Sequence, residues 1–321
     1  MTTIVTIGGG TGTFVVLSGL RRLPDVELSA IVTSADDGGS TGHLRDAYGF
    51  LPAGDARQAL VALAEDGNVL RDLFAYRFEK SDIKGHNLGN LFLTALTDLL
   101  GSDAAALEEA SRILRVCGTV IPATLEPTTL VARLADGSII KNERFIDDHA
   151  MGRARIEELA LETQAPLSPA AEDAIEQADL IILGPGDLYT SSIAALLPEG
   201  MKEAVQASKA RLVYIGNLFT KTGQTEGFTA RDHVREIARY AGREPDVIML
   251  NDNGLSKEVL EKYAAEGEYP PVDDFLPTDA RVKRLPLVSV YTVPPVESDP
   301  LPRSLVRHDP AKLAAALSTL F

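Results

Sequence analysis

The order in which apolar strands, glycine turns and helices follow one another constrains this fold more than any other sequence feature. Residues 3–8, TIVTIG, form a short β-branched apolar run, and the turn GGGTG then leads into an amphipathic stretch that ends near Arg22. A second apolar run, LSAIVTS, occupies residues 28–34. Strand, turn, helix and strand in this order make a βαβ unit, whose strands are parallel and whose crossover is right-handed. The sequence therefore predicts an α/β fold with a mainly parallel sheet.

The same pattern returns in the second half of the chain. ADLIILGPGDLYTSSIAALL repeats strand, glycine turn and helix, and RLVYIGN and DVIMLND have the composition of two further buried strands. Ser168 and Pro169 are predicted to begin one helix, and Thr229 with Asp232 another. We expect these strands to continue the same sheet.

The remaining segments predict helices, an insertion and a tail. Residues 55–115 are predicted to be mostly helical, with Asp55 as the N-cap of the first helix. Residues 117–165 are predicted to form a small β-rich insertion, because two apolar runs flank Asp136-Gly137, a strong hairpin signal. Residues 255–321 are predicted to wrap the domain, with proline-dense stretches and a last helix at 310–319. Residues 1–321 are therefore expected to be one α/β domain that carries the insertion.

The charge balance excludes several classes of partner. The chain has 46 acidic and 31 basic residues, a formal net charge of -15, which repels nucleic-acid phosphates and anionic lipid. No apolar run approaches the roughly 20 residues of a membrane span, and the N-terminus has no basic signal region. The single cysteine, Cys117, is expected to be a small buried side chain without a disulfide. These features predict a cytoplasmic protein without membrane insertion or nucleic-acid binding.

The turn IGGGTGTF is the first candidate for ligand binding. It fails the dinucleotide fingerprint G-x-G-x-x-G, since the sixth position is Thr13 from Gly8 and Val15 from Gly10, so a nicotinamide oxidoreductase is poorly supported. The glycines would still let backbone approach a ligand, two threonines offer hydroxyls, and the helix N-terminus favours an anion. A tight turn without a ligand is the alternative. The predicted ligand-binding residues here are Gly9, Gly10, Thr11, Gly12 and Thr13.

A second glycine turn, LGPGDLYTSS, follows a predicted strand in the same way. The carboxyl ends of parallel strands meet at one edge of the sheet, where ligands bind in open α/β folds. The two turns are therefore expected to face one cleft. The predicted ligand-binding residues here are Gly184, Pro185, Gly186, Tyr189 and Thr190.

The stretch TSADDGGSTGHLR, residues 33–45, is too polar to be buried without partners. We predict that Asp36 or Asp37 faces a ribose or a metal, since an acid often follows this strand in dinucleotide folds, and both are weak catalytic candidates. Ser40 and Thr41 are expected to face phosphate or sugar, with Arg45 as a nearby cation. A solvated turn with no task is the alternative.

Amide side chains at one predicted helix start and after one predicted strand complete the set. Asn87 and Asn90 follow His86 in GHNLGNLFL, and Asn217 follows a strand in IGNLFT. Amides can pair with a base or sugar through both donor and acceptor atoms. His86 is expected to be structural, because no nucleophile or acid lies at a recognisable triad spacing from it.

Seven blocks together resemble a known family: IGGGTGTFVVLSGL, TSADDGGSTGHLR, LPAGDARQALVALA, GHNLGNLFL, VIPAT, LGPGDLYTS and NLFTKTGQTEGFTARDHV. They resemble the signature blocks of the YvcK-type gluconeogenesis factors, in family order from residue 4 to about residue 234. These factors belong to the CofD-like superfamily, which also contains the 2-phospholactate transferases. The resemblance implies a Rossmann-like three-layer α/β/α fold. Asp187 differs from the serine expected at this position in that family.

The resemblance also implies a function. YvcK-type factors bind nucleotide sugars such as UDP-N-acetylglucosamine and are linked to gluconeogenic growth, cell shape and cell-wall synthesis, without a settled reaction. The alternative is a magnesium-dependent phosphotransferase of the 2-phospholactate transferase type, for which Asp36, Asp37 and Asp187 would be near the cleft. Mg²⁺ is the one cofactor that the resemblance implies. Protein partners in wall synthesis and a homo-oligomer are left open.

Overall fold

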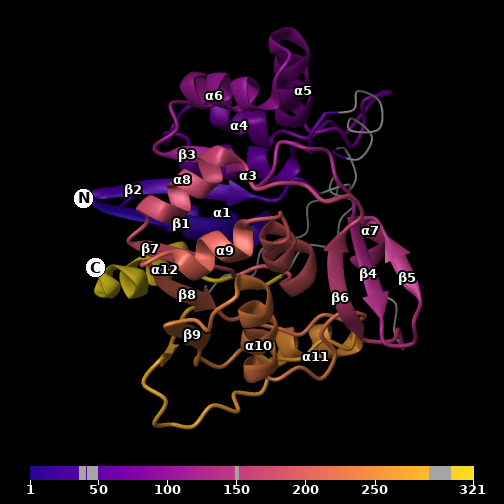
Figure 1. Ribbon diagram of the computed structural model, residues 1–321, viewed down its shortest axis with the longest axis vertical. Helices are drawn as coiled ribbons and strands as arrows, with labels where there is room; N and C mark the ends of the chain where they lie inside the picture. Colours follow the sequence, from indigo (N-terminus) through magenta and orange to yellow (C-terminus); the bar gives the residue numbers. More distant parts are fainter. Residues whose placement is uncertain (36–40, 42–49, 149–151, 289–304) are drawn as a thin grey trace.

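The computed structural model describes residues 1–35, 41, 50–148, 152–288 and 305–321. Its centre is a seven-stranded sheet in the order β10-β9-β8-β7-β1-β2-β3 (Figure 1), and every neighbouring pair in it is parallel. The strands are β1 (Thr2–Gly8), β2 (Val26–Val32), β3 (Thr119–Pro122), β7 (Leu180–Leu183), β8 (Arg211–Ile215), β9 (Val247–Asn251) and β10 (Val282–Leu285). The prediction of a Rossmann-like α/β fold with a mainly parallel sheet is confirmed.

The strand order reverses between β1 and β7. From β1 the chain moves outward to β2 and β3, and it then returns to pair β7 with the other side of β1. β8, β9 and β10 continue outward from β7. Such a switch point leaves a crevice at the carboxyl ends of the two central strands, where ligands bind in open α/β sheets.

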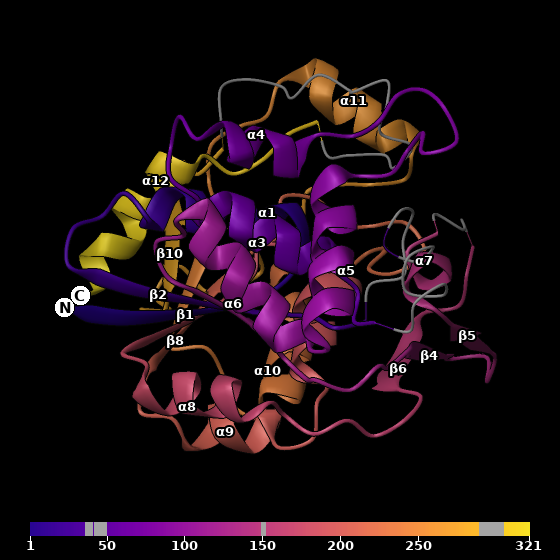
Figure 2. The same cartoon turned by 90° about the horizontal axis from the view of Figure 1, so that it is seen from above.

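Helices cover both faces of the sheet, because alternate side chains of each strand point to opposite faces. Ile4 of β1 packs into a core with the helices of one face, whereas Val5 and Ile7 pack into the core of the other. The first face carries α1 (Gly10–Leu20), α3 (Gly54–Leu63), α4 (Val69–Ala75), α5 (Leu88–Leu100), α6 (Asp103–Leu114) and α12 (Pro310–Leu317). The second carries α8 (Pro169–Gln177), α9 (Met201–Ala207) and α10 (Ala230–Ala241), as Figure 2 shows.

A separate three-stranded antiparallel sheet lies beside the main one (Figure 1). Its strands are β4 (Leu130–Leu134), β5 (Ile139–Lys141) and β6 (Ile156–Leu161), and α7 (Glu143–Ile146) follows β5. Asp136-Gly137 turns the hairpin as predicted, with Gly137 at φ +86°. The predicted insertion at 117–165 begins too early, because β3 pairs with β2 in the main sheet. We call β4, β5, β6 and α7 the small lobe.

Two local predictions are wrong. Asp55 is not an N-cap: Ala53 holds that position, and the Asp55 carboxylate instead accepts a hydrogen bond from the Gly10 backbone N–H. Cys117 is exposed, because it lies in the turn between α6 and β3. By contrast, the caps at Ser168 and Thr229 are confirmed, the latter as a capping box with Asp232.

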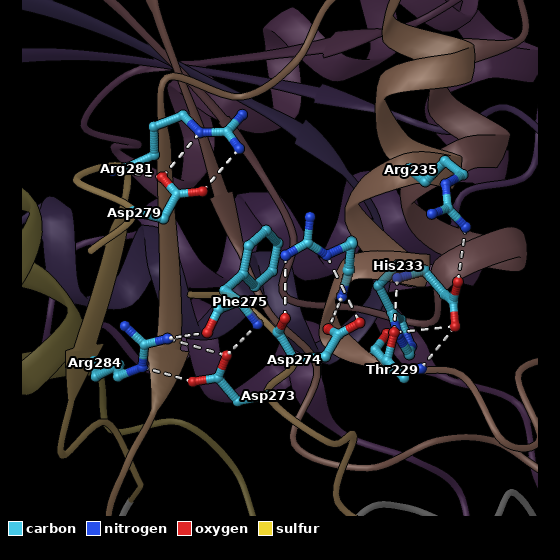
Figure 3. A network of polar contacts seen from close by, with 11 residues as sticks. Thr229, His233, Arg235, Asp273, Asp274, Phe275, Asp279, Arg281 and Arg284 are labelled. Carbon is cyan, nitrogen blue, oxygen red and sulfur yellow. Dashed lines mark hydrogen bonds and ion pairs between the residues drawn. The ribbon is translucent and has the colours of Figure 1, made fainter. Parts of the chain in front are cut away.

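The segment before β10 is joined to α10 by charged groups. Arg231 of α10 pairs with Asp274, and Arg284 of β10 pairs with Asp273 at 2.6 Å (Figure 3). The Arg231 guanidinium also lies over the Phe275 ring. The predicted C-terminal segment includes α11 (Lys257–Ala265), β10 and α12. Within the described ranges, no helix is both long and apolar enough to cross a membrane.

Candidate functional site

The two glycine turns meet at the switch point of the sheet. The first follows β1 and the second follows β7, so both stand at the carboxyl ends of adjacent strands. A Cβ atom added to Gly12 would overlap the carbonyl oxygen of Pro185. A Cβ on Gly186 would lie 3.7 Å from the carbonyl oxygen of Gly9. The turns therefore contact one another backbone to backbone.

The N-terminus of α1 has no side-chain cap, but one of its backbone N–H groups binds a carboxylate. Its N-cap, Gly9, has no side chain to satisfy the first backbone N–H groups, which together with the helix dipole favour an anion. Asp55 supplies one such anion: its Oδ1 accepts from the Gly10 N–H at 2.8 Å, and the residue is 8% exposed. Thr11 and Gly12 are half-buried in the same turn, whereas Thr13 is buried. No local sequence pattern indicates this role of Asp55, because the contact spans 45 residues.

Arg57, Asn90 and Thr41 form a buried chain of hydrogen bonds. The Arg57 Nε–H donates to Asn90 Oδ1 at 2.9 Å, and Asn90 Nδ2 donates to Thr41 Oγ1 at 3.2 Å. All three are less than a tenth exposed. Asn90 and Thr41, both predicted as ligand contacts, are therefore brought together, and Arg57 is a cation that the sequence analysis did not single out.

The Asn87 side chain caps the N-terminus of α5. Its side-chain oxygen caps α5 by accepting from the Asn90 N–H, and its Nδ2 donates to the Ala75 carbonyl. His86 belongs to the turn just before α5, where its N–H donates to the Ile83 carbonyl and its own carbonyl accepts from the Phe78 N–H. The side-chain contacts of Asn87 hold the start of α5, and the backbone of His86 closes the turn before it.

Asn217 and Tyr189 support the second glycine turn. Asn217 Nδ2 donates to the Gly186 carbonyl at 2.6 Å, and its Oδ1 accepts from the Tyr214 hydroxyl. The buried Tyr189 hydroxyl donates to Glu236 of α10 at 3.4 Å, and burial raises the pKa of the phenol. Asn217 thus fixes the turn, while Tyr189 joins it to α10.

The acid at the end of the second turn is paired with a lysine. Lys221 Nζ donates to Asp187 Oδ2 at 2.6 Å and also pairs with Asp147 at the end of α7. Thr190 Oγ1 and Gln224 Nε2 donate to the same Asp147 oxygen. We call Asp147, Asp187, Thr190, Lys221 and Gln224 the lysine cluster. The cluster joins the end of α7 to the segments that follow β7 and β8. Of its five residues, only Thr190 and Asp187 were singled out by the sequence motifs.

A small cavity of about 30 Å³ adjoins the carboxyl ends of β2 and β3. Burial raises the pKa of Asp103 on its wall, although hydrogen bonds from Leu51 and Thr97 oppose this shift. Other wall residues are Val32, Thr33, Ser34, Ala56, Leu93, Thr94, Leu107 and Pro122. The wall is largely apolar.

Four predicted residues, Asp36, Asp37, Ser40 and Arg45, lie outside the described residues. Within the part that is described, no group of three or more His, Cys, Asp or Glu side chains could hold a metal. Mg²⁺ commonly takes only one or two protein carboxylates together with phosphate oxygens, and Asp55 at the first turn fits that smaller set.

Comparisons with known proteins identify the family. The family profile described as "2-phospho-L-lactate transferase CofD" matches residues 4–291. A "Gluconeogenesis factor" from Bacillus subtilis is 38% identical over 99% of this chain and 97% of its own length. Another from Halalkalibacterium halodurans is 38% identical over 98% of this chain and 95% of its own. A crystal structure of a UPF0052-family protein from Bacillus halodurans matches with a TM-score of 0.88 at 36% identity, covering 98% and 99% of the two chains.

These matches extend over nearly the whole chain and confirm the resemblance carried by the seven sequence blocks. The Rossmann-like fold and the two glycine turns lie inside the matched region. The chain belongs to the CofD family, and within it is similar to the gluconeogenesis factors.

Proposed function

We propose that this protein binds a nucleotide sugar of the UDP-N-acetylglucosamine type and acts as a regulatory protein linked to gluconeogenic growth. The observation that carries this proposal is the contact of Gly12 with the Pro185 carbonyl at the switch point. A nucleoside diphosphate has two phosphates, and two adjacent glycine turns can donate backbone N–H groups to both phosphates.

The electrostatics of the protein support recognition by neutral dipoles. With a net charge of -15, the chain as a whole repels a phosphate ligand. Lys221 is neutralised by carboxylates, and Arg57 is buried against Asn90. Within the described residues, we therefore assign most of the attraction for phosphate to backbone N–H groups of the turns. Asn90 and Thr41 are candidate polar contacts for ribose or base.

The cellular role follows from the relatives. Proteins named gluconeogenesis factor match this chain over most of their length, which supports a link to growth on gluconeogenic carbon. Nucleotide sugars are precursors of wall polymers, so we extend the proposal to a role in cell shape and cell-wall synthesis. We propose that the protein acts in the cytoplasm. We also propose that the protein binds partner proteins of cell-wall synthesis and assembles into a homo-oligomer.

Calorimetric titration with UDP-N-acetylglucosamine tests the ligand. Gly186→Ala is the variant of choice, since its Cβ would lie 3.3 Å from Ser191 Cβ and 3.7 Å from the Gly9 carbonyl, close enough to crowd the place where the two turns meet without breaking the fold. We expect it to raise Kd by about tenfold or more, which corresponds to about 1.4 kcal/mol.

Gly254→Ala is the matched control, because nothing lies within 4 Å of a Cβ at that position. It should leave Kd unchanged. Absence of binding by the unmodified protein at about 1 mM ligand, or equal Kd values for Gly186→Ala and the control, would contradict the proposal.

A magnesium-dependent transferase of phosphorus-containing groups is the second candidate. The observation that favours it is the buried Asp55 carboxylate at the N-terminus of α1, beside the first glycine turn. ³¹P NMR of a nucleotide-activated donor with acceptor and Mg²⁺ would report transfer directly. Turnover that requires Mg²⁺ and disappears in Asp55→Asn would support an enzyme, and binding without turnover would support the regulator.

A further inference from the structure

The lysine cluster contains more hydrogen-bond acceptors than the chain satisfies. Gln224 is 3% exposed, its Nε2 donates to Asp147, and its Oε1 is buried without a partner in the described parts of the chain. The amide orientation is fixed by Asp147, because an ionised carboxylate can only accept. A buried oxygen without a partner is costly, so this side chain points to a donor that the chain does not supply.

The two carboxylates also retain acceptor capacity. The bonds from Lys221, Thr190 and Gln224 all reach Asp147 Oδ1, and Lys221 reaches only Oδ2 of Asp187. Among the described residues, the second oxygen of each carboxylate therefore has no hydrogen bond. The side chains of Asp147 and Asp187 are 34% and 43% exposed, so a ligand can reach them.

The positive charge of Lys221 stabilises the two neighbouring carboxylates. Burial alone would lower the pKa of Lys221, but the charges of Asp187 and Asp147 raise it above its ordinary value, so the ammonium group stays protonated. Its charge and hydrogen bond hold the pKa of Asp147 below the usual range, against the effect of burial. Two anions and one cation leave one net negative charge, which suits neutral donors such as hydroxyl groups and opposes a further anion.

The position of the cluster relates it to the glycine turns. Asp187 follows Gly186 directly, and Gly186 is the turn residue whose Cβ would lie near the Gly9 carbonyl. Asp187 is therefore the first side chain beyond the second turn that a group attached to a phosphate bound at the two turns would meet. The small lobe supplies Asp147 on the other side of Lys221.

We propose that Asp147, Asp187 and Gln224, held in place by Lys221, are the subsite for the sugar of the ligand, and that they accept hydrogen bonds from the hydroxyls of a neutral sugar. This inference rests on the proposed binding of a nucleotide sugar. It adds the chemical class of the sugar, since an acceptor-rich site with net negative charge selects a neutral hexose and rejects a uronic acid. Asp187, which replaces the serine expected from the family resemblance, is the specificity-determining residue.

Calorimetry with two charge-matched ligands tests the subsite. UDP-N-acetylglucosamine and the methyl ester of UDP carry the same phosphate charge, but only the first has a sugar. We expect the unmodified protein to bind the sugar nucleotide about tenfold or more tightly than the ester. Asp187→Asn and Gln224→Leu should each reduce that ratio below about threefold, while the Kd of the ester changes by less than about threefold.

A second pair of ligands, one with a charged sugar and one with a neutral sugar, tests the negative charge of the site. UDP-glucuronate should bind at least about tenfold more weakly than UDP-glucose, and Asp187→Asn should remove most of this difference. Asp173→Asn, an exposed position on α8, is the matched control and should change neither ratio. Urea unfolding of each variant separates a lost subsite from a lost fold.

The outcomes are distinct. If the unmodified protein binds neither sugar nucleotide nor ester, the proposed function fails and this inference with it. If the ester binds but the sugar adds nothing, or if the ratios survive in both variants, the proposed function stands and the subsite is overturned. Equal affinities for glucose and glucuronate forms in the unmodified protein would also overturn it.

Discussion

The contact between Gly12 and the Pro185 carbonyl leaves no room for a side chain at position 12. We expect Gly12→Ala to lower the free energy of unfolding by about 2–4 kcal/mol, because the new methyl group must push two backbone turns apart at the centre of the sheet. Urea unfolding followed by circular dichroism measures this. Gly254→Ala, whose Cβ would meet open space, should change stability by less than about 0.5 kcal/mol. Equal effects of the two substitutions would mean that the turns are not in backbone contact.

Glu268 gives the protein a measurable pH dependence. Burial, together with the charges of Glu266 and Asp187, raises the pKa of this carboxyl to about 7, although Lys221 and a hydrogen bond from Thr222 oppose the shift. Because the folded-state pKa lies above the ordinary value of 4.5, the folded protein binds this proton more tightly than the unfolded one. The stabilising contribution is therefore complete below pH 4.5 and is lost as pH rises through about 7.

The comparison with Glu268→Gln isolates that contribution. We expect the unmodified protein to lose on the order of 3 kcal/mol relative to the variant between the two pKa values. Taking the difference between the two proteins cancels other titrating groups, such as His308, whose pKa burial lowers to about 4. Parallel stability curves for the two proteins between pH 4.5 and about 7 would show that Glu268 is not the group responsible.

Single residues also show what sequence reasoning could reach. The glycine turns were predictable because the backbone chemistry of a turn is local. The pairing of Lys221 with Asp187 and of Arg57 with Asn90 was not, since each joins side chains more than 30 residues apart along the chain. Their partners depend on which strands are neighbours, and no local pattern encodes that.

At the level of elements, periodicity and caps predicted most helices and strands of the sheet. Val26–Val32, Leu180–Leu183 and Val247–Asn251 are buried strands as expected from their apolar composition. The sequence predicts that β3 belongs to the insertion, because it precedes the hairpin along the chain, whereas its partner is β2, about 90 residues earlier. Cys117 was expected to be buried because its neighbours are apolar, but the end of α6 at Leu114 turns it outward.

Among the described residues, the small lobe is joined to α10 by two hydrogen bonds of β6, one of which is the bond from Arg239 Nη1 to the Glu157 carbonyl at 2.9 Å. The Leu159 N–H of β6 donates to the Tyr240 hydroxyl of α10 at 2.8 Å. We expect Tyr240→Phe to destabilise this junction by about 1 kcal/mol, which should raise the hydrogen-exchange rate of the Leu159 amide by about fivefold if the lobe opens locally. Exchange measured by NMR or mass spectrometry reads the effect in β6 directly.

Tyr269→Phe is the matched control for this prediction, because Tyr269 is 56% exposed. It should leave exchange in β6 unchanged. If Tyr240→Phe accelerates exchange throughout the main sheet as strongly as in β6, the lobe does not open as a separate unit.

At the level of the whole molecule, the site depends on the order of the strands. The sequence predicts parallel strands and glycine turns, but not that β7 lies beside β1. That neighbour relation depends on the long crossover of the chain from the β2 side of the sheet through the small lobe and α8. The switch point, and with it the contact between the turns, becomes visible only once the fold is known.

The net charge of the protein determines how salt should affect ligand binding. In a protein with a basic phosphate pocket, salt screens the attraction and weakens binding. Here the net charge of -15 repels the ligand at long range, while backbone N–H groups attract it at contact. Raising NaCl from about 20 mM to about 300 mM should therefore leave the Kd for UDP-N-acetylglucosamine within about threefold, or lower it. Uridine, which has no charge, is the control ligand and should be insensitive to salt. A rise in Kd of about tenfold or more for the sugar nucleotide would instead mean that exposed cations hold the phosphates.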